Sequence, residues 1–130
     1  MKPSLLLLFN HAPTRLQLAD ADAALGVERI VPLPEELKPL WDAVPPELES
    51  IEVQLAPIRA WVEDASRPAD FILIQGDFGA AYLMVRFALE KGLIPIYSTT
   101  DREAAEQHKE DGSVTLTHNF RHVRFRRYGE

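Results

Sequence analysis

The 130 residues are enough for one domain (residues 1–130) with its own core, and 46% hydrophobic with 26% charged residues is typical of a compact globular protein. The absence of cysteine excludes disulfide bonds and thiolate metal sites and fits a cytoplasmic location. The net charge of −6 argues against a surface that coats DNA or other nucleic acid in general. The apolar run from Leu5 to Phe9 is too short for a signal peptide or a membrane span, so we expect no membrane partner.

The first third of the chain predicts a strand, a helix and a second strand. Residues 4–9 are almost continuously apolar, as in a strand buried on both faces. Thr14 and Gln17 have the spacing of a capping box, which predicts a helix over residues 14–26. Residues 27–33 then predict the second strand.

The middle of the chain predicts helices broken by proline. Pro34 suits the first turn of a helix, and Pro45-Pro46 interrupts it. Residues 48–62 carry apolar residues at alternating spacings of three and four, which predicts a second helix. Pro57 removes one backbone hydrogen bond there, so we expect a kink at that residue.

The next segment repeats the strand–helix pattern. Residues 69–75 predict a third buried strand, and the glycine-containing turn after it opens onto an apolar helix over residues 80–91. Residues 94–98 predict the fourth strand. Thr100 and Glu103 match a second capping box, which predicts a short polar helix.

The C-terminal segment has a different pattern. Asp111-Gly112 is expected to end the polar helix. Residues 114–118 and 122–128 alternate apolar and polar, which predicts two half-exposed strands around a turn at residues 119–121. Four arginines lie in the last ten residues, so a local positive site for an anion and a charged edge strand that resists aggregation are both open interpretations.

Alternating strands and helices predict an α/β domain with a Rossmann-like, mostly parallel sheet of order 2-1-3-4, helices on both faces and a C-terminal edge hairpin. The order reverses between the first and third strands, and ligands bind in the crevice outside the carboxyl ends of such strands. The loops expected there are Asn10-His11, residues 75–79 and residues 98–100. The sequence therefore predicts one rim, with these candidate ligand-binding residues: Asn10, Gln75, Gly76, Asp77, Phe78, Gly79, Ser98 and Thr100.

The residue types at this rim suit a phosphate or a nucleotide. Glycines let the backbone approach a ligand, a helix start offers N–H groups to an anion, and amides recognise base edges. Thr99 adds a hydroxyl donor and Arg102 a positive charge. The spacing G-x-x-G is not the dinucleotide fingerprint, so NAD and FAD are not expected, and no other cofactor is indicated.

Several of these residues have a purely structural interpretation, which the sequence leaves open. Gly76 and Gly79 can simply shape a turn with Asp77 as the helix cap. His118 and His122 can be edge residues, although His118 becomes a ligand contact if the polar helix crosses back to the rim. The histidines lack partners at metal-ligand spacing, and no serine stands on a G-x-S-x-G elbow, so neither a metal site nor a Ser-His-Asp arrangement is predicted.

Seven sequence pieces together resemble a known family. They are LLLLFNH, a threonine-capped helix ending in LGV, LPEEL, W-x-x-x-P-P, QGDFGA, PIYSTT and HVRFRRY. Together they cover nearly the whole chain and resemble small stand-alone accessory proteins of type III CRISPR systems with a CARF-like fold. Asn10 departs from the pattern, which has serine before the histidine.

The resemblance implies a homodimer that binds a cyclic oligoadenylate, with cyclic tetra-adenylate as the expected ligand, and cleaves it as a ring nuclease. The hypothesis for catalysis needs no metal: a ribose 2′-OH attacks the adjacent phosphate in line. His11 would act as the general base, while donors from Gly79, Thr99 and Arg102 would stabilise the phosphoryl charge. The products would be linear di-adenylates ending in a 2′,3′-cyclic phosphate.

Two alternatives belong to other classes of protein. The same dimer could hold the messenger without cutting it, as a sponge or sensor. Alternatively, the acidic middle segment with Trp41 and Trp61 could dock onto a protein partner. The tryptophans could equally be core residues, and the sequence does not decide.

Overall fold

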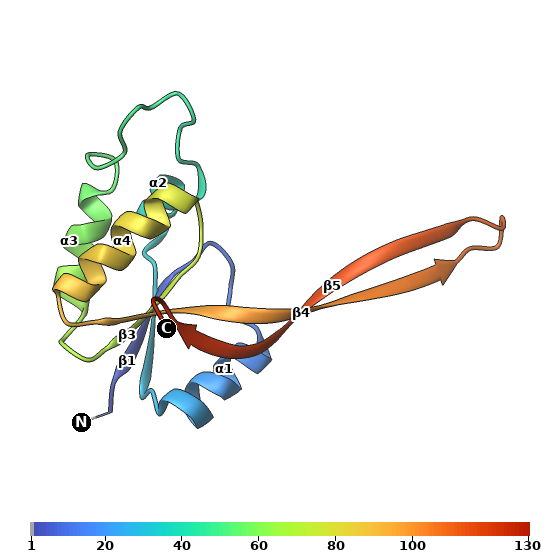
Figure 1. Cartoon of the computed structure of the whole chain (residues 1–130), viewed down its shortest axis with the longest axis horizontal. Helices are drawn as coiled ribbons and strands as arrows, with labels where there is room; N and C mark the ends of the chain where they lie inside the picture. Colours follow the sequence, from blue (N-terminus) through green and yellow to red (C-terminus); the bar gives the residue numbers. More distant parts are fainter. Residues whose placement is uncertain (1) are drawn as a thin grey trace.

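A computed structural model describes residues 2–130, apart from the side chains of residues 103–105 and 117–119. Its described part is an α/β domain with a five-stranded sheet of order β2-β1-β3-β4-β5 (Figure 1). The first four strands run parallel and keep the order 2-1-3-4, and β5 joins antiparallel at the edge. The strands are β1 (Ser4–Leu8), β2 (Arg29–Pro32), β3 (Phe71–Ile74), β4 (Ile94–His108) and β5 (Val114–Arg127).

Helices cover both faces of the sheet (Figure 1). On one face lies α1 (Arg15–Asp20), which continues into a π-helical turn, η1 (Ala21–Leu25). On the other lie α3 (Ala56–Ala65), α4 (Phe78–Glu90) and α2 (Lys38–Asp42), the last preceded by a 3₁₀ turn, η2 (Glu35–Leu37).

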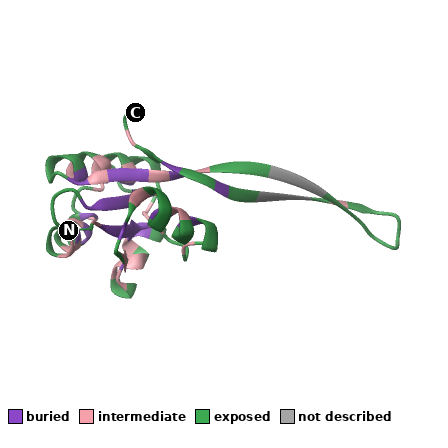
Figure 2. Cartoon of the chain, turned by 90° about the horizontal axis from the view of Figure 1, so that it is seen from below, coloured by how far each residue is buried: buried purple, intermediate pink, exposed green. Residues whose placement is uncertain are grey.

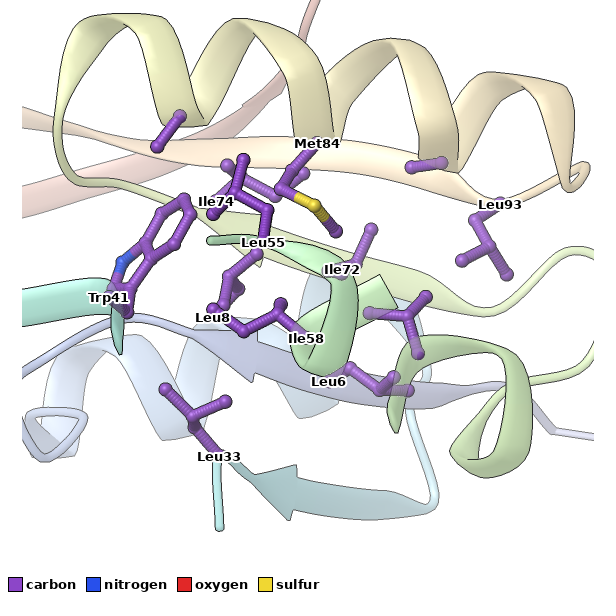
Figure 3. Packing of buried hydrophobic residues seen from close by; sticks show 13 residues of the cluster. Leu6, Leu8, Leu33, Trp41, Leu55, Ile58, Ile72, Ile74, Met84 and Leu93 are labelled. Atoms are coloured by element: carbon purple, nitrogen blue, oxygen red, sulfur yellow. The ribbon is translucent and has the colours of Figure 1, made fainter. Parts of the chain in front are cut away.

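Two hydrophobic layers, one on each face, hold the sheet. Leu6 and Leu8 of β1 and Ile72 and Ile74 of β3 pack beneath α2, α3 and α4 with Trp41 (Figure 3). The alternate residues of the same strands pack on the α1 side. Because successive side chains of a strand point to opposite faces, the residues on both faces must be apolar, which explains the unbroken apolar runs. Figure 2 shows the buried residues concentrated in these central strands.

The start of α1 has the predicted cap. The Thr14 side chain accepts the Gln17 backbone N–H at 3.2 Å, and the Gln17 side chain accepts the Thr14 N–H at 2.9 Å. Gly26 ends the helical segment in the left-handed conformation with φ +64°. Only glycine adopts this conformation without a steric cost, so the predicted stop is also confirmed.

The predicted helix over residues 48–62 is wrong in extent. The segment begins as turns, and α3 starts only at Ala56. Pro57 therefore lies in the first turn of the helix rather than at a kink. The reason is physical: the first turn has no intrahelical partner for its N–H groups, so proline is tolerated there.

The predicted polar helix after Thr100 is wrong, because β4 continues to His108. Thr100 pairs with His122 of β5 and caps no helix, and Glu103 lies within the strand. His108, expected on the helix, stands exposed at the strand end. Local helix preference is weak compared with a long ladder of tertiary hydrogen bonds, and here the pairing with β5 prevails.

The predicted hairpin is also wrong in position. β5 runs unbroken through residues 119–121, where the turn was expected. The chain reverses instead at residues 109–113, where the Lys109 N–H donates to the Ser113 carbonyl and Gly112 has φ +86°. The residues read as a helix stop are a hairpin turn, because aspartate and glycine serve both structures.

Strands β4 and β5 extend beyond the rest of the sheet as a two-stranded arm, defined here as residues 100–122 (Figure 1). Strand β3 pairs with β4 only up to Ile96, whereas β4 pairs with β5 up to His108. Along most of the arm, β4 and β5 therefore pair only with each other. No helix in the described residues 2–130 is long and apolar enough to cross a membrane.

Candidate functional site

The carboxyl ends of β1, β3 and β4 are held together at one level of the sheet. Leu8 of β1 is paired with Ile74 of β3, and Leu73 is paired with Ile96 of β4. The Gln75 N–H donates to the Leu8 carbonyl at 3.2 Å. The loops after β1 and β3 therefore leave the sheet side by side, next to Ser98 of β4.

Gln75 is fixed by two further groups at this junction. Its carbonyl accepts the indole N–H of Trp41 at 2.9 Å, and its side-chain Oε1 accepts the Ser98 N–H at 2.8 Å. A backbone N–H only donates, so the amide end bonded to Ser98 is the oxygen and the NH₂ group is the other end. Gln75 therefore offers two oriented donors at the rim.

The turn after Gln75 is shaped by packing and by helix capping. A Cβ on Gly76 would lie 2.8 Å from the Trp41 indole, so no larger residue fits without a shift. The Asp77 carboxylate accepts the Ala80 N–H at 3.0 Å and caps α4. The Ala80 N–H is therefore not available to bind an anion, and the negative charge of Asp77 repels an anion at the N-terminus of α4.

A Ser-His-Asp chain of hydrogen bonds lies on the α1 face, contrary to the sequence interpretation, with Ser98 and His122 buried and Asp20 partly exposed. The Ser98 hydroxyl is 2.5 Å from Nδ1 of His122, and Nε2 of His122 is 2.8 Å from Oδ2 of Asp20. The His122 side chain is only 3% exposed. With the Asp20 carboxylate as acceptor, the Nε2–H group of His122 donates to it, and Nδ1 then accepts the hydrogen bond from the serine hydroxyl.

This Ser-His-Asp chain of hydrogen bonds is placed to support the fold rather than nucleophilic attack. Ser98 is buried, and its own N–H is taken by Gln75, so it does not serve as an oxyanion donor. The three side chains instead join the end of α1 to β4 and β5. Through the Ser98 N–H, the same chain continues to Gln75 at the rim.

A bulge explains why the sequence did not reveal His122. The β4–β5 register shifts between Thr99 and Thr100, which leaves Val123 as an extra residue in β5. His122 and Phe125 therefore face the same side, with ring centroids 4.6 Å apart, although simple alternation separates them. The Thr99 hydroxyl holds the bulge, because it donates to the Arg124 carbonyl at 3.0 Å and accepts the Arg124 N–H at 3.2 Å.

An aromatic pocket of about 500 Å³ lies beside the rim on the α4 face. Gln75 and Gly76 form one side of it. Tyr97 and Tyr128 lie on another side, with ring centroids 4.8 Å apart. Tyr97 and Tyr128 were absent from the site predicted from the sequence. An alternating apolar and polar pattern indicates only that these strand ends are half-buried, not that they line a pocket. The lining comprises Gln75, Gly76, Phe78, Ala81, Tyr82, Val85, Tyr97 and Tyr128.

Among the described residues, no group of three or more His, Cys, Asp or Glu side chains is arranged to hold a metal ion.

Burial raises the pKa of the Tyr128 phenol, with a smaller contribution from Tyr97. The phenol is therefore a stable donor, and it donates to the Ile74 carbonyl at 2.5 Å.

Residues 3–126 match the family model described as "Uncharacterized protein MJ1673 family". The chain belongs to this family. The protein described as "Uncharacterized protein MJ1673" of Methanocaldococcus jannaschii is 47% identical over 126 residues, which are 97% of each chain. No solved structure matches this chain.

In this member of the MJ1673 family, the predicted site residues divide between the rim and the arm. Asn10 and His11 are exposed in the loop after β1, where the His11 ring meets Phe9 edge-on with centroids 5.4 Å apart. Arg102 lies on the arm with its guanidinium 6.0 Å from the Phe120 ring centroid. The side chain of His118 lies outside the described residues, and its backbone pairs with Ala104 in the arm.

The tryptophans of the docking alternative belong to the core. Trp41 is 2% exposed, and Trp61 packs against the same hydrophobic cluster. Trp41 therefore offers no surface to a protein partner, whereas Trp61 is only half-buried.

Proposed function

We propose that this protein is a CARF-like ring nuclease that binds cyclic oligoadenylate, with cyclic tetra-adenylate as the main ligand, and switches off type III CRISPR signalling. The observation that carries the proposal is the junction at Gln75. It places a donor-bearing amide and an aromatic pocket where the loops after β1 and β3 leave the sheet. Such a crevice at a reversal of strand order is where open α/β sheets bind nucleotides.

The charge distribution supports an anionic ligand despite the net charge of −6. Strand β5 carries four arginines and no acidic residue. Three of them, Arg124, Arg126 and Arg127, line a second pocket of about 430 Å³, where they outnumber the two acidic residues of the lining, Asp20 and Glu130. Because Asp77 caps α4, we assign the phosphates of the ring to the β5 side and its bases to the α4 side.

In the proposed reaction the ring supplies its own nucleophile. A ribose 2′-OH attacks the adjacent phosphorus, the P–O5′ bond breaks, and the departing 5′ oxygen takes a proton from water. A 2′,3′-cyclic phosphate and a 5′-OH form without a metal or cofactor. His11 accepts the 2′-OH proton, and correct alignment alone supplies on the order of several kcal/mol. Arg102 stabilises the phosphoryl charge. Thr99 takes part only if its hydroxyl leaves Arg124 when the ring binds.

A second copy of the chain completes this proposed site. Four like nucleotides in a ring have two-fold symmetry, which an isologous dimer matches. We assign the arm to this contact. An isolated two-stranded ribbon is only marginally stable, and Leu116 and Phe120 on it are 56% and 69% exposed.

The second candidate is a protein that binds the ring without cutting it. Two contacts favour it: the exposed His11 ring lies against the Phe9 ring, and the Thr99 hydroxyl is held by Arg124. Purified protein is incubated with cyclic tetra-adenylate in EDTA and the products are separated by chromatography. Linear di-adenylate supports the nuclease, whereas tight binding with intact ring rejects cleavage and leaves the sponge.

A further inference from the structure

The aromatic pocket exposes two rings that no other part of the described chain covers. Phe78 is 93% exposed and Tyr82 is 61% exposed, four residues apart on the same side of α4. Across the pocket stand Tyr97 and Tyr128, which come from β4 and the residue after β5. Aromatic rings from the helix layer and from the sheet thus line the same pocket.

Arginines flank this pocket. The Arg126 guanidinium lies 5.6 Å from the Tyr97 ring centroid, and its Nη1 donates to the Tyr97 hydroxyl at 3.1 Å. The Arg86 guanidinium lies 5.7 Å from the Tyr82 ring centroid. No carboxylate is among the residues that line the pocket. In a chain with a net charge of −6, this local arrangement suits an anion attached to an aromatic group.

One polar group in the lining is already oriented. The Ser98 N–H fixes the oxygen of the Gln75 amide, so the NH₂ group presents donors to acceptor atoms of a ligand. A pocket of about 500 Å³ falls within the size range of small-molecule sites, roughly 300–1,000 Å³.

We propose that this pocket holds one purine base of the bound oligoadenylate, stacked against Tyr82 and Phe78 and contacted by the Gln75 amide. The inference rests on the proposed function and extends it, because it assigns base recognition to named side chains of the α4 face and adds Tyr82, which the rim predicted from the sequence lacks. Aromatic stacking suits a base, since every base has a π face, and arginine beside the rings suits the attached phosphate.

A second copy of the chain is the main competing occupant of the same face. It fits less well because the Gln75 amide presents oriented donors in the lining, and because Arg86 and Arg126 lie against the Tyr82 and Tyr97 rings. The centre of a subunit interface is instead depleted of charged side chains. The two occupants make different predictions for a single aromatic substitution.

The test compares Tyr82→Ala, Tyr82→Phe and the matched control Leu89→Ala. Leu89 is 57% exposed on the same helix and does not line the pocket. Binding of cyclic tetra-adenylate and of adenosine 5′-monophosphate is measured by calorimetry, and the oligomeric state by sedimentation. Tyr82→Ala should weaken binding of the ring by about 5- to 100-fold, while Tyr82→Phe and Leu89→Ala bind as the wild type does.

The outcomes separate this inference from the proposed function. Equal binding of the ring by wild type and Tyr82→Ala overturns the base pocket and leaves ring binding intact. A wild type that binds the monophosphate but no ring overturns the proposed function and leaves the pocket. Binding of neither overturns both. Conversion of Tyr82→Ala to a monomer, with ring affinity otherwise unchanged, shows that the face is a subunit interface.

Discussion

The Trp41 indole occupies the space where a side chain on Gly76 would begin. A Cβ built on Gly76 lies 2.8 Å from the ring, and the same indole donates to the carbonyl of Gln75. The turn that carries the candidate site is therefore fastened to the hydrophobic core on the α4 side.

Gly76→Ala is expected to destabilise the fold by about 1–3 kcal/mol, because the added methyl group overpacks against a buried ring. The measurement is the free energy of unfolding from urea titration. Retention of full stability would mean that Trp41 is free to move and that the turn is not fixed by it.

Gly79→Ala is the matched control in the same turn, and it is expected to have the opposite sign. A Cβ on Gly79 meets only ordinary contacts, at 3.5 Å from Asp77 and 3.7 Å from Ile51. Alanine in a helix is favoured over glycine by about 0.8–1 kcal/mol, so the variant should be slightly more stable. If the ring approaches the backbone here, the same variant binds it more weakly.

His122→Ala is expected to lower the free energy of unfolding by about 1–3 kcal/mol. It leaves the Asp20 carboxylate and the buried Ser98 hydroxyl without their partner. His108→Ala, at a side chain that is 74% exposed, is the control and should change stability by less than about 0.5 kcal/mol. Equal effects of the two substitutions would contradict the structural role of the Ser-His-Asp hydrogen bonds.

Apart from the extent of the helix predicted over residues 48–62, the N-terminal two thirds of the fold could be predicted, because its signals are local. The apolar runs of β1 and β3 and the Thr14 capping box each specify one structure, and strand order then places the rim. The C-terminal part could not be predicted in the same way. Residues 101–108 have a helical pattern locally, and they are extended only because β5, distant from most of them in sequence, pairs with them.

The candidate site was predicted in the same partial way. Topology placed Gln75 and Ser98 together, and their hydrogen bond is observed. His122 was missed because a bulge of one residue reverses its facing, and Asp20 was missed because its partner lies 102 positions away. Neither a register shift nor such a distant pairing leaves a local signal in one sequence.

Tyr128→Phe tests the pH dependence of the fold. Burial raises the pKa of this phenol above 10.0, so its contribution to stability is complete below pH 10 and is lost as the pH rises through the higher folded value. At neutral pH the variant should lose about 1–3 kcal/mol, because the Ile74 carbonyl loses its donor. Above pH 10 the wild type should lose stability faster than the variant. Parallel curves would contradict this assignment.

His11→Ala tests the proposed general base. Single-turnover cleavage of cyclic tetra-adenylate should fall by about 100- to 10,000-fold while affinity is retained. Unchanged cleavage excludes His11 as the base.

Arg102→Ala tests the proposed phosphate contact. Affinity and rate should fall together, because the positive charge acts on the ring both when it binds and when it reacts. A variant that matches the wild type in both measurements shows that Arg102 does not contact the phosphate.

The arm is tested by replacing residues 103–119 with an Asn-Gly turn, which joins the paired positions Arg102 and Phe120. The shortened chain should be a monomer in sedimentation, with the circular dichroism of the core retained. Persistence of a dimer would place the contact elsewhere.

The most direct test of ring recognition is calorimetric titration of the protein with cyclic tetra-adenylate in EDTA. The predicted result is saturable binding with one ring for two chains. Absence of binding to rings of three, four and six adenylates, or saturation at one ring for each chain, would contradict the proposed two-fold site.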